Sequence, residues 1–275
     1  MNVHAQPASR LKSLDPVWDA VRADAERIVA SEPGLTSMVM ANVLNHESFE
    51  AALAHRLAQR LDHPDVSADL IRQAFHDALA IRPEVGADAR ADLIATLERD
   101  PATHRVIVPF LYFKGYQAIQ THRFAHVLWT HNRKDFALYL QSRSSQVFQV
   151  DINPNARIGK GMMLDHATGF VVGETAVIGD NCSILQGVTL GGTGKADEDR
   201  HPKIGDGVLI GAHAVVLGNI KIGHCARIGA GSVVVKDVAP RVTVVGVPAR
   251  PVGEAGVGAP QPATTMDQAV PDISG

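Results

Sequence analysis

The chain has 275 residues, of which 45% are hydrophobic and 20% are charged, and its formal net charge at pH 7 is −3. This length suffices for two domains, the lack of a strong basic patch argues against nucleic-acid binding, and no apolar run is long enough to span a bilayer. Because the N-terminus lacks a secretion-signal pattern and the two cysteines, Cys182 and Cys225, have no CxxC spacing, we expect a cytoplasmic protein without disulfides.

Helical patterns fill the first half of the chain and predict an all-α domain over residues 1–147. Asp15 precedes Pro16, which is the order expected of an N-cap followed by a first-turn proline, and Pro33 with Gly34 ends this first helix. Further amphipathic segments predict helices over 35–45, 48–61, 67–81, 87–99, 108–130 and 133–147.

A six-residue period follows the helical half. An aliphatic residue returns every sixth position, and a glycine comes directly after most of these residues. This period fits neither a helix nor a lone strand; it is typical of a hexapeptide solenoid, a parallel β-helix whose stacked coils bury one apolar column. The aliphatic positions are Ile152, Ile158, Leu164, Val172, Ile178, Ile184, Leu190, Ile204, Ile210, Val216, Ile222, Ile228 and Val234. Cys182 lies at a recurring small-residue position, which favours a packing role.

The sequence therefore predicts an α+β chain with an all-α domain over 1–147 and a parallel β-helix over 148–250. The last segment, 251–275, is rich in glycine, proline and alanine and lacks periodicity, so we expect a mobile tail.

The six-residue register breaks twice. Two extra residues separate Leu164 from Val172, and the step from Leu190 to Ile204 is fourteen residues. Insertions in solenoids become loops on one face, often the binding face. We expect the charged, glycine-rich segment 192–203 to project from the column.

Candidate chemical groups lie at these breaks. His166 follows Asp165 at the first break and is a candidate general base, and Asp151, about one coil earlier, could orient its imidazole. Arg200, beside His201 in the second insertion, could hold a carboxylate with its guanidinium fork. From the residues alone, alternatives stay open: a solvated surface histidine, a strand-entry aspartate and a solvated charged loop.

A metal site is not predicted. Zinc needs three converging ligands. His201 and His213 are twelve residues apart and could stack two hexapeptides apart, but a third partner is missing.

Several runs of residues closely resemble the serine acetyltransferase family. They are FQVDI at 148–152, MLDHATG at 163–169, VGETAVIG at 172–179, ILQGVTLGGTGK at 184–195, RHPKI at 200–204 and GVPAR at 246–250. The resemblance extends into the helical half through RDPA at 99–102 and LYFKGYQA at 111–118. Generic hexapeptide acyltransferases share the repeat but not this combination.

The resemblance implies transfer of an acetyl group from acetyl-CoA to the hydroxyl of L-serine, giving O-acetylserine on the route to cysteine. It also implies a left-handed β-helix, active sites between neighbouring solenoids of a trimer, and two trimers joined by the helical domains into a hexamer. L-Cysteine is the implied feedback inhibitor, and the segment at about 237–255 is implied to rearrange when it binds.

Residue roles follow from the same resemblance. His166 would be the general base and Asp151 its orienting partner, while Asp100 and Asp165 would hold the serine ammonium group. Arg200 would hold the carboxylate, with His201 nearby. The implied lining of the CoA groove consists of Gly191, Gly192, Ala212 and Ala230.

Two alternatives and one departure remain. The chain could be a hexapeptide acetyltransferase for another hydroxyl acceptor, such as homoserine, a sugar or an antibiotic, or a non-catalytic solenoid used for assembly. In the family, a C-terminal isoleucine often docks into O-acetylserine sulfhydrylase. Here Ile273 is not the last residue, so its carboxylate cannot serve as the docking group and the partnership is left doubtful.

Overall fold

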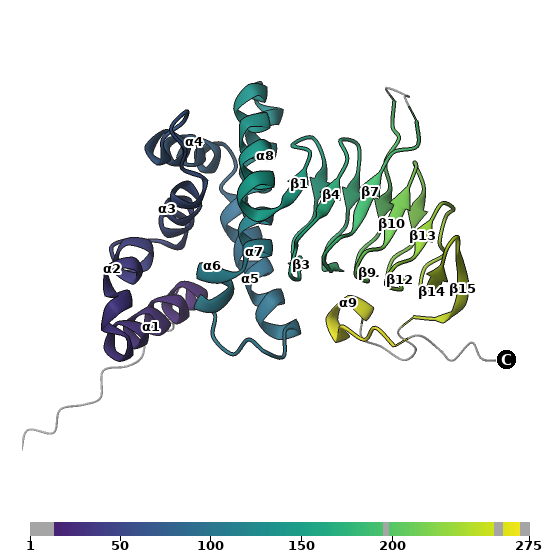
Figure 1. Ribbon diagram of the computed structural model, residues 1–275. Coiled ribbons are helices and arrows are strands. Elements are labelled where there is room, and N and C mark those ends of the chain that lie inside the picture. Colours follow the sequence, from purple (N-terminus) through teal and green to yellow (C-terminus); the bar gives the residue numbers. More distant parts are fainter. Residues whose placement is uncertain (1–13, 195–197, 256–260, 270–275) are drawn as a thin grey trace, which may run out of the picture.

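A computed structural model describes residues 14–194, 198–255 and 261–269. A group of helices stands at one end of a parallel β-helix, and the helices α7 (Lys114–Thr130) and α8 (Lys134–Phe148) lie beside its first coil (Figure 1). The other N-terminal elements are α1 (Pro16–Ser31), η1 (Pro33–Leu35), α2 (Thr36–Val39), η2 (Met40–Leu44), α3 (Phe49–Leu61), α4 (Ala68–Ile81), α5 (Glu84–Arg99) and α6 (Ile107–Tyr112). None of the helices in the described ranges is both long and apolar enough to cross a membrane.

The beginning of α1 confirms the N-cap prediction. Asp15 accepts a hydrogen bond from the backbone N of Trp18 at 3.1 Å, and Pro16 occupies the first turn. This side chain satisfies one of the amide groups that a helix leaves unpaired at its N-terminus.

Two helix predictions are wrong in detail. The segment 35–45 is not one helix but a succession of short 3₁₀, α and π turns. The predicted helix 108–130 is broken at Phe113, whose φ of −84° and ψ of 110° are extended. The Gln117 side chain donates to the carbonyl of Leu111 at 2.9 Å, and Arg56 donates to the same oxygen at 2.5 Å. Side chains thus replace the backbone donors that a continuous helix would supply.

In the described residues the β-helix has three sheets, and each of its first four coils adds one strand to each sheet. The next coil adds β13 to the first sheet and β14 to the third. The strand orders of the sheets are β1-β4-β7-β10-β13, β2-β5-β8-β11 and β3-β6-β9-β12-β14-β15, and among these described strands only the β14–β15 pair is antiparallel. The strands are β1 (Val150–Ile152), β2 (Arg157–Ile158), β3 (Met163–Leu164), β4 (Phe170–Val172), β5 (Val177–Ile178), β6 (Ser183–Ile184), β7 (Thr189–Gly191), β8 (Lys203–Ile204), β9 (Leu209–Ile210), β10 (Val215–Leu217), β11 (Lys221–Ile222), β12 (Arg227–Ile228), β13 (Val233–Val234), β14 (Val242–Gly246) and β15 (Ala249–Glu254).

The six-residue register is confirmed by the strand pairing. In the first sheet Ile152, Val172, Leu190, Val216 and Val234 lie directly above one another. All five are at most 4% exposed and form part of the buried column. The glycines after the aliphatic residues allow close stacking of the coils: a Cβ on Gly211 would lie 2.6 Å from the backbone N of Ala230.

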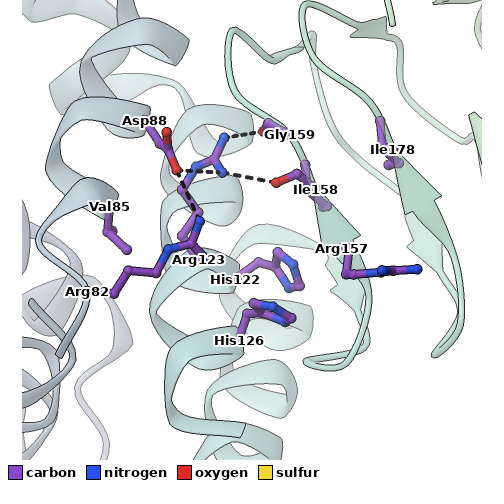
Figure 2. Close-up of a pocket in the computed structure, with 10 residues that line it drawn as sticks. All are labelled: Arg82, Val85, Asp88, His122, Arg123, His126, Arg157, Ile158, Gly159 and Ile178. Atoms are coloured by element: carbon purple, nitrogen blue, oxygen red, sulfur yellow. Dashed lines mark hydrogen bonds and ion pairs between the residues drawn. The ribbon is translucent and has the colours of Figure 1, made fainter. Parts of the chain in front are cut away.

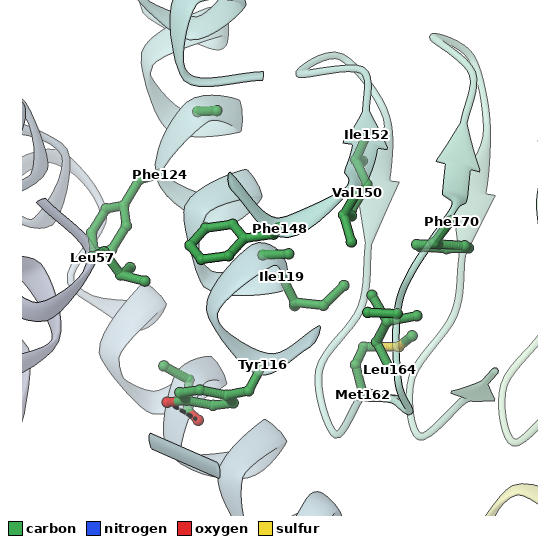
Figure 3. Packing of buried hydrophobic residues seen from close by; sticks show 14 of the residues in the cluster. Leu57, Tyr116, Ile119, Phe124, Phe148, Val150, Ile152, Met162, Leu164 and Phe170 are labelled. Carbon is green, nitrogen blue, oxygen red and sulfur yellow. Dashed lines mark hydrogen bonds between the residues drawn. The ribbon is translucent and has the colours of Figure 1, made fainter. Parts of the chain in front are cut away.

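Apolar side chains join the helices to the first coils. Figure 3 shows Ile119 and Phe148 from α7 and α8 packed beside Val150, Met162 and Phe170 of the β-helix. All five are buried. The hydrophobic core is therefore continuous between the two halves of the chain.

A buried ion pair reinforces this junction. Asp92 of α5 is 1% exposed and accepts hydrogen bonds from Arg123 Nη2 at 2.7 Å, from Gln120 at 2.9 Å and from the backbone N of Met162 at 2.8 Å. Arg123 also donates to the carbonyl of Gly159 at 2.6 Å. Two helices and the turn between β2 and β3 are thereby fixed to one another.

The described part of the predicted tail, 251–275, packs against the β-helix. It includes most of β15 and the short helix α9 (Pro262–Thr265). The Ser183 hydroxyl donates to the carbonyl of Ala263 at 2.7 Å, and Arg227 donates to the carbonyl of Ala269 at 2.8 Å. Ile273 lies outside the described residues.

Acid is expected to destabilise the fold through His122. Burial, followed by the nearby charges of His126 and Arg123, lowers the pKa of His122 to about 3, whereas an unfolded histidine titrates near 6.5. Below pH 6.5 the unfolded chain therefore binds a proton that the folded chain excludes. The resulting contribution to stability is complete above pH 6.5 and is lost as pH falls toward 3, by about 1.4 kcal/mol per pH unit.

Urea unfolding between pH 4 and 7 measures this effect. His122→Gln is expected to flatten the fall in unfolding free energy by about one proton. The same slope in both proteins would exclude His122 as a source of acid sensitivity.

Candidate active site

His166 lies in a strained corner of the β-helix. The corner, residues 165–169, connects β3 to β4, and His166 and Ala167 have φ angles of 54° and 62°. Such left-handed conformations of non-glycine residues cost about 1–3 kcal/mol and cluster at functional sites. The His166 side chain is 73% exposed, and its Nε2 lies 3.7 Å from Asp165 Oδ2. The corner thus presents an accessible imidazole next to a carboxylate.

Asp100 and Asp165 form an acidic pair beside His166. Burial raises the pKa of Asp165, the charge of His166 opposes this effect, and the negative charge of Asp100 adds to it. Asp100 ends α5, where its two carboxylate oxygens accept from Ala102 N at 2.9 Å and Thr103 Oγ1 at 2.6 Å. Two carboxylates at one corner can attract a positively charged ammonium group.

Arg99 anchors the end of α5 at this corner. It is 7% exposed, and its Nη1 donates to Ser183 Oγ at 3.0 Å and to the carbonyl of Cys182 at 3.2 Å. Both acceptors belong to the β6 region of the β-helix. The neighbouring Asp100 is therefore held near Asp165 by a long-range contact that no local pattern indicates.

Asp151 has a different partner from the one predicted. It is the middle residue of β1, and its Oδ1 accepts a hydrogen bond from Gln141 of α8 at 2.7 Å. Within the described ranges, Asp151 and His166 share no hydrogen bond or ion pair. Its orienting role stays a prediction, and Gln141 is a contact that the sequence did not reveal.

Arg200 and His201 contact a second corner of the β-helix, residues 173–176, which connects β4 to β5. Arg200 Nη2 lies 2.9 Å from Glu174 Oε2. The Thr175 hydroxyl accepts from the backbone N of both Arg200 and His201, at 3.1 and 3.2 Å, and lies 2.8 Å from His201 Nδ1. Sequence reasoning missed Glu174 and Thr175 as partners of the insertion, because 26 or 25 residues separate them from it.

His201 fits tightly over Gly173. A Cβ on this glycine would lie 1.9 Å from His201 Nε2, so a larger residue would displace the imidazole. Burial, followed by the charges of Arg200 and Lys203, lowers the pKa of His201. The end of the insertion 192–203 is therefore packed against the β-helix, and His201 is buried there. Residues 195–197 of the insertion lie outside the described ranges.

The predicted site residues divide between two edges of the solenoid. Ala212 and Ala230 lie on the same edge as His166, because consecutive corners there are joined by hydrogen bonds such as His213 N to Gln186 O at 2.9 Å and Gly231 N to Ala212 O at 2.8 Å. The other edge carries Arg200 and His201, together with Gly191 and Gly192. One copy of the chain therefore does not assemble all of these residues at a single point.

His201 and His213 also lie on different edges and do not form a pair. Among the residues that the structure describes, no group of three or more His, Cys, Asp or Glu side chains is arranged to hold a metal ion. Cys182 is fully buried, and this burial raises its pKa to about 12, which agrees with a packing role.

Comparison with known proteins decides the family. A family model described as "Serine acetyltransferase, N-terminal" matches residues 17–121, and a bacterial transferase hexapeptide model matches residues 201–236. A curated serine acetyltransferase of Salmonella typhimurium is 50% identical over 257 residues, which cover 94% of this chain and 93% of the relative. The chain belongs to the serine acetyltransferase family. The resemblance predicted from the sequence is confirmed.

Solved serine acetyltransferase structures share the fold. One from Brucella abortus, in complex with coenzyme A, is 58% identical and matches with a TM-score of 0.87 over 88% of this chain and 97% of its own. Another, in complex with cysteine, is 47% identical and matches with a TM-score of 0.90 over 92% and 98% of the two chains. The predicted fold class of the family, a helical domain followed by a left-handed β-helix, is confirmed.

Proposed function

We propose that this chain is a serine O-acetyltransferase, which transfers the acetyl group of acetyl-CoA directly to the hydroxyl of L-serine in cysteine biosynthesis. The observation that carries the proposal is the 50% identity to a serine acetyltransferase over nearly the whole chain. The exposed His166, placed beside two carboxylates on a rigid coil, supports it.

The proposed reaction needs a base. A serine hydroxyl is a weak nucleophile, so His166 would take its proton while the oxygen attacks the thioester carbonyl. The new O–C bond forms, the C–S bond breaks, and the proton passes from His166 to the departing CoA sulfur. Because a thioester is already activated, no acetylated enzyme is required, and holding both substrates in one groove supplies further acceleration.

Substrate contacts follow from charge. Asp100 and Asp165 would bind the ammonium group of serine, and Arg200 would bind its carboxylate through a bidentate contact. In one copy of the chain Arg200 is paired with Glu174, so serine would compete with this carboxylate. Asp151 would orient His166 once substrate is bound. Small residues would leave room for the pantetheine arm of CoA: Gly191, Gly192, Ala212 and Ala230.

Oligomerisation would complete the site. Since His166 and Arg200 lie on different edges, the Arg200 edge of one solenoid would face the His166 edge of its neighbour. We therefore expect a trimer or a hexamer in solution. Multi-angle light scattering of the active enzyme measures this state, and a fully active monomer would contradict the proposal.

A thiol-release assay tests the function. Acetyl-CoA with L-serine should release free CoA, whereas homoserine, a sugar or an antibiotic should react much more slowly. Faster release with one of these acceptors would favour the alternative of a hexapeptide acetyltransferase with a different substrate. No release with any acceptor would favour a non-catalytic solenoid.

Arg200→Ala is expected to raise both the KM for serine and the inhibition constant for L-cysteine. The two amino acids share an ammonium and a carboxylate group, so the same clamp should hold both. Loss of one charge-assisted contact corresponds to about 1.5–3 kcal/mol, or roughly 10- to 150-fold in each constant. Steady-state kinetics with serine varied at several cysteine concentrations measure both; an unchanged cysteine response would place the inhibitor at a separate site.

A further inference from the structure

A cavity of about 290 Å³ lies at the junction between the helical half and the β-helix (Figure 2). None of its lining residues belongs to the candidate active site. His122, Arg123 and His126 of α7 face it from one side, and Arg157 of β2 lies on the other. Arg82, which caps the C-terminus of α4, and Asp88 of α5 complete its charged lining.

The charges around this cavity are unbalanced. Arg123 is paired with the buried Asp92 at 2.7 Å. Asp88 then remains as the carboxylate in the lining, 3.8 Å from the nearest nitrogens of Arg82 and Arg123. Within the described part of the chain, no hydrogen bond or ion pair involves the Arg157 guanidinium. The cavity therefore has an excess positive charge although the whole chain carries a formal charge of −3.

One of the two histidines, His126, can add to this charge. His126 Nδ1 lies 2.8 Å from the carbonyl of Pro154; a carbonyl only accepts, so Nδ1 carries the proton and Nε2 remains for a second one. His122 is 5% exposed, lines the cavity, and its Nδ1 has no hydrogen-bond partner among the described residues. Because its pKa is about 3, His122 is neutral between pH 6 and 8 and contributes a polar lining rather than a charge.

We propose that this cavity binds a small tetrahedral oxyanion of the sulfate or phosphate class, held by Arg82, Arg157 and the protonated ring of His126. Its volume lies at the lower limit of ligand pockets, which suits an ion rather than a larger molecule. Arginine recognises such oxyanions through paired hydrogen bonds. By linking β2 to α7, the bound ion would strengthen the contact between the two halves of the chain.

Binding should be coupled to proton uptake. Burial, with the charges of Arg82 and Arg157, lowers the pKa of His126 in the free protein. An oxyanion beside the ring reverses this effect, so binding strengthens as pH falls. The charged and titratable groups that face the cavity are Arg82, Asp88, His122, Arg123, His126 and Arg157, with Asp92 behind Arg123.

Inorganic sulfate is the appropriate first probe, because it does not change its own charge between pH 6 and 8. Isothermal titration calorimetry of the full-length protein at constant ionic strength should show saturable binding. The affinity should rise toward pH 6 by at most about tenfold per pH unit for one proton. Phosphate in a parallel titration determines which oxyanion binds more tightly. Neither measurement depends on acetyl transfer, so failure here leaves the proposed function untouched.

The sulfate affinities of matched variants test where the ion binds. Arg157→Ala should weaken sulfate binding at least tenfold. Lys221→Ala should not, although Lys221 occupies the same position of the same sheet as Arg157, three coils further along. Asp88→Asn should strengthen binding by removing the opposing charge, and His126→Gln should abolish the pH dependence.

Three outcomes would overturn the proposal. They are the absence of saturable sulfate binding to the wild-type protein, equal affinity in Arg157→Ala and wild type, and equal losses in Arg157→Ala and Lys221→Ala. Because Arg157 is exposed and its side chain forms no hydrogen bond within the described ranges, its replacement should leave the fold intact.

Discussion

Replacing His166 with alanine is expected to lower the kcat of acetyl transfer to serine about 10²- to 10⁴-fold, which is the usual contribution of a positioned general base. The side chain is 73% exposed and belongs to a corner rather than to the buried column. Its removal should therefore leave the fold, the assembly and CoA binding nearly unchanged. Steady-state assays of CoA release measure the loss of kcat, and calorimetric titration with CoA measures whether CoA binding is retained.

A second exposed histidine provides the control for this variant. His224 lies on a corner that carries none of the candidate site residues, so His224→Ala should retain wild-type turnover. Asp151→Asn should cost less than His166→Ala if Asp151 only orients the ring. Wild-type kcat in His166→Ala would remove this residue from the mechanism.

Asp92→Ala is expected to lower the free energy of unfolding by about 3–5 kcal/mol, the usual cost of removing one partner of a buried ion pair. Burial raises the pKa of Asp92 despite the neighbouring Arg123, so the desolvation of this carboxylate outweighs the attraction of its partner. The loss in the variant comes from Arg123, Gln120 and the Met162 amide, which remain buried without their acceptor.

Chemical unfolding curves measure this loss, and a surface ion pair serves as the comparison. Asp69 pairs with Arg72 at 2.9 Å on the exposed side of α4, and Asp69→Ala should cost less than about 1 kcal/mol. Because Asp100 caps the C-terminus of α5, loosening this helix should raise the KM for serine. A stability of Asp92→Ala within 1 kcal/mol of the wild type would show that apolar packing alone holds the two halves together.

The features that the sequence determined are those set by neighbouring residues. The six-residue period predicted the stacked column, because each coil repeats the same short-range pattern of strand and turn. The cap at Asp15 and the corner at His166 were predicted for the same reason, as a helix cap and a break in register are both visible within a few residues.

Only the tertiary structure decided the contacts between distant segments. Arg56 donates a hydrogen bond to the Leu111 carbonyl at the break near Phe113, and the backbone of Arg200 donates to the Thr175 hydroxyl. The cavity is formed where α7 meets β2. These partners are 25 or more residues apart, and no periodicity encodes which of many polar residues will meet across such a distance. Local patterns fix the conformation of each segment, whereas the packing of the segments selects the partners of their buried polar groups.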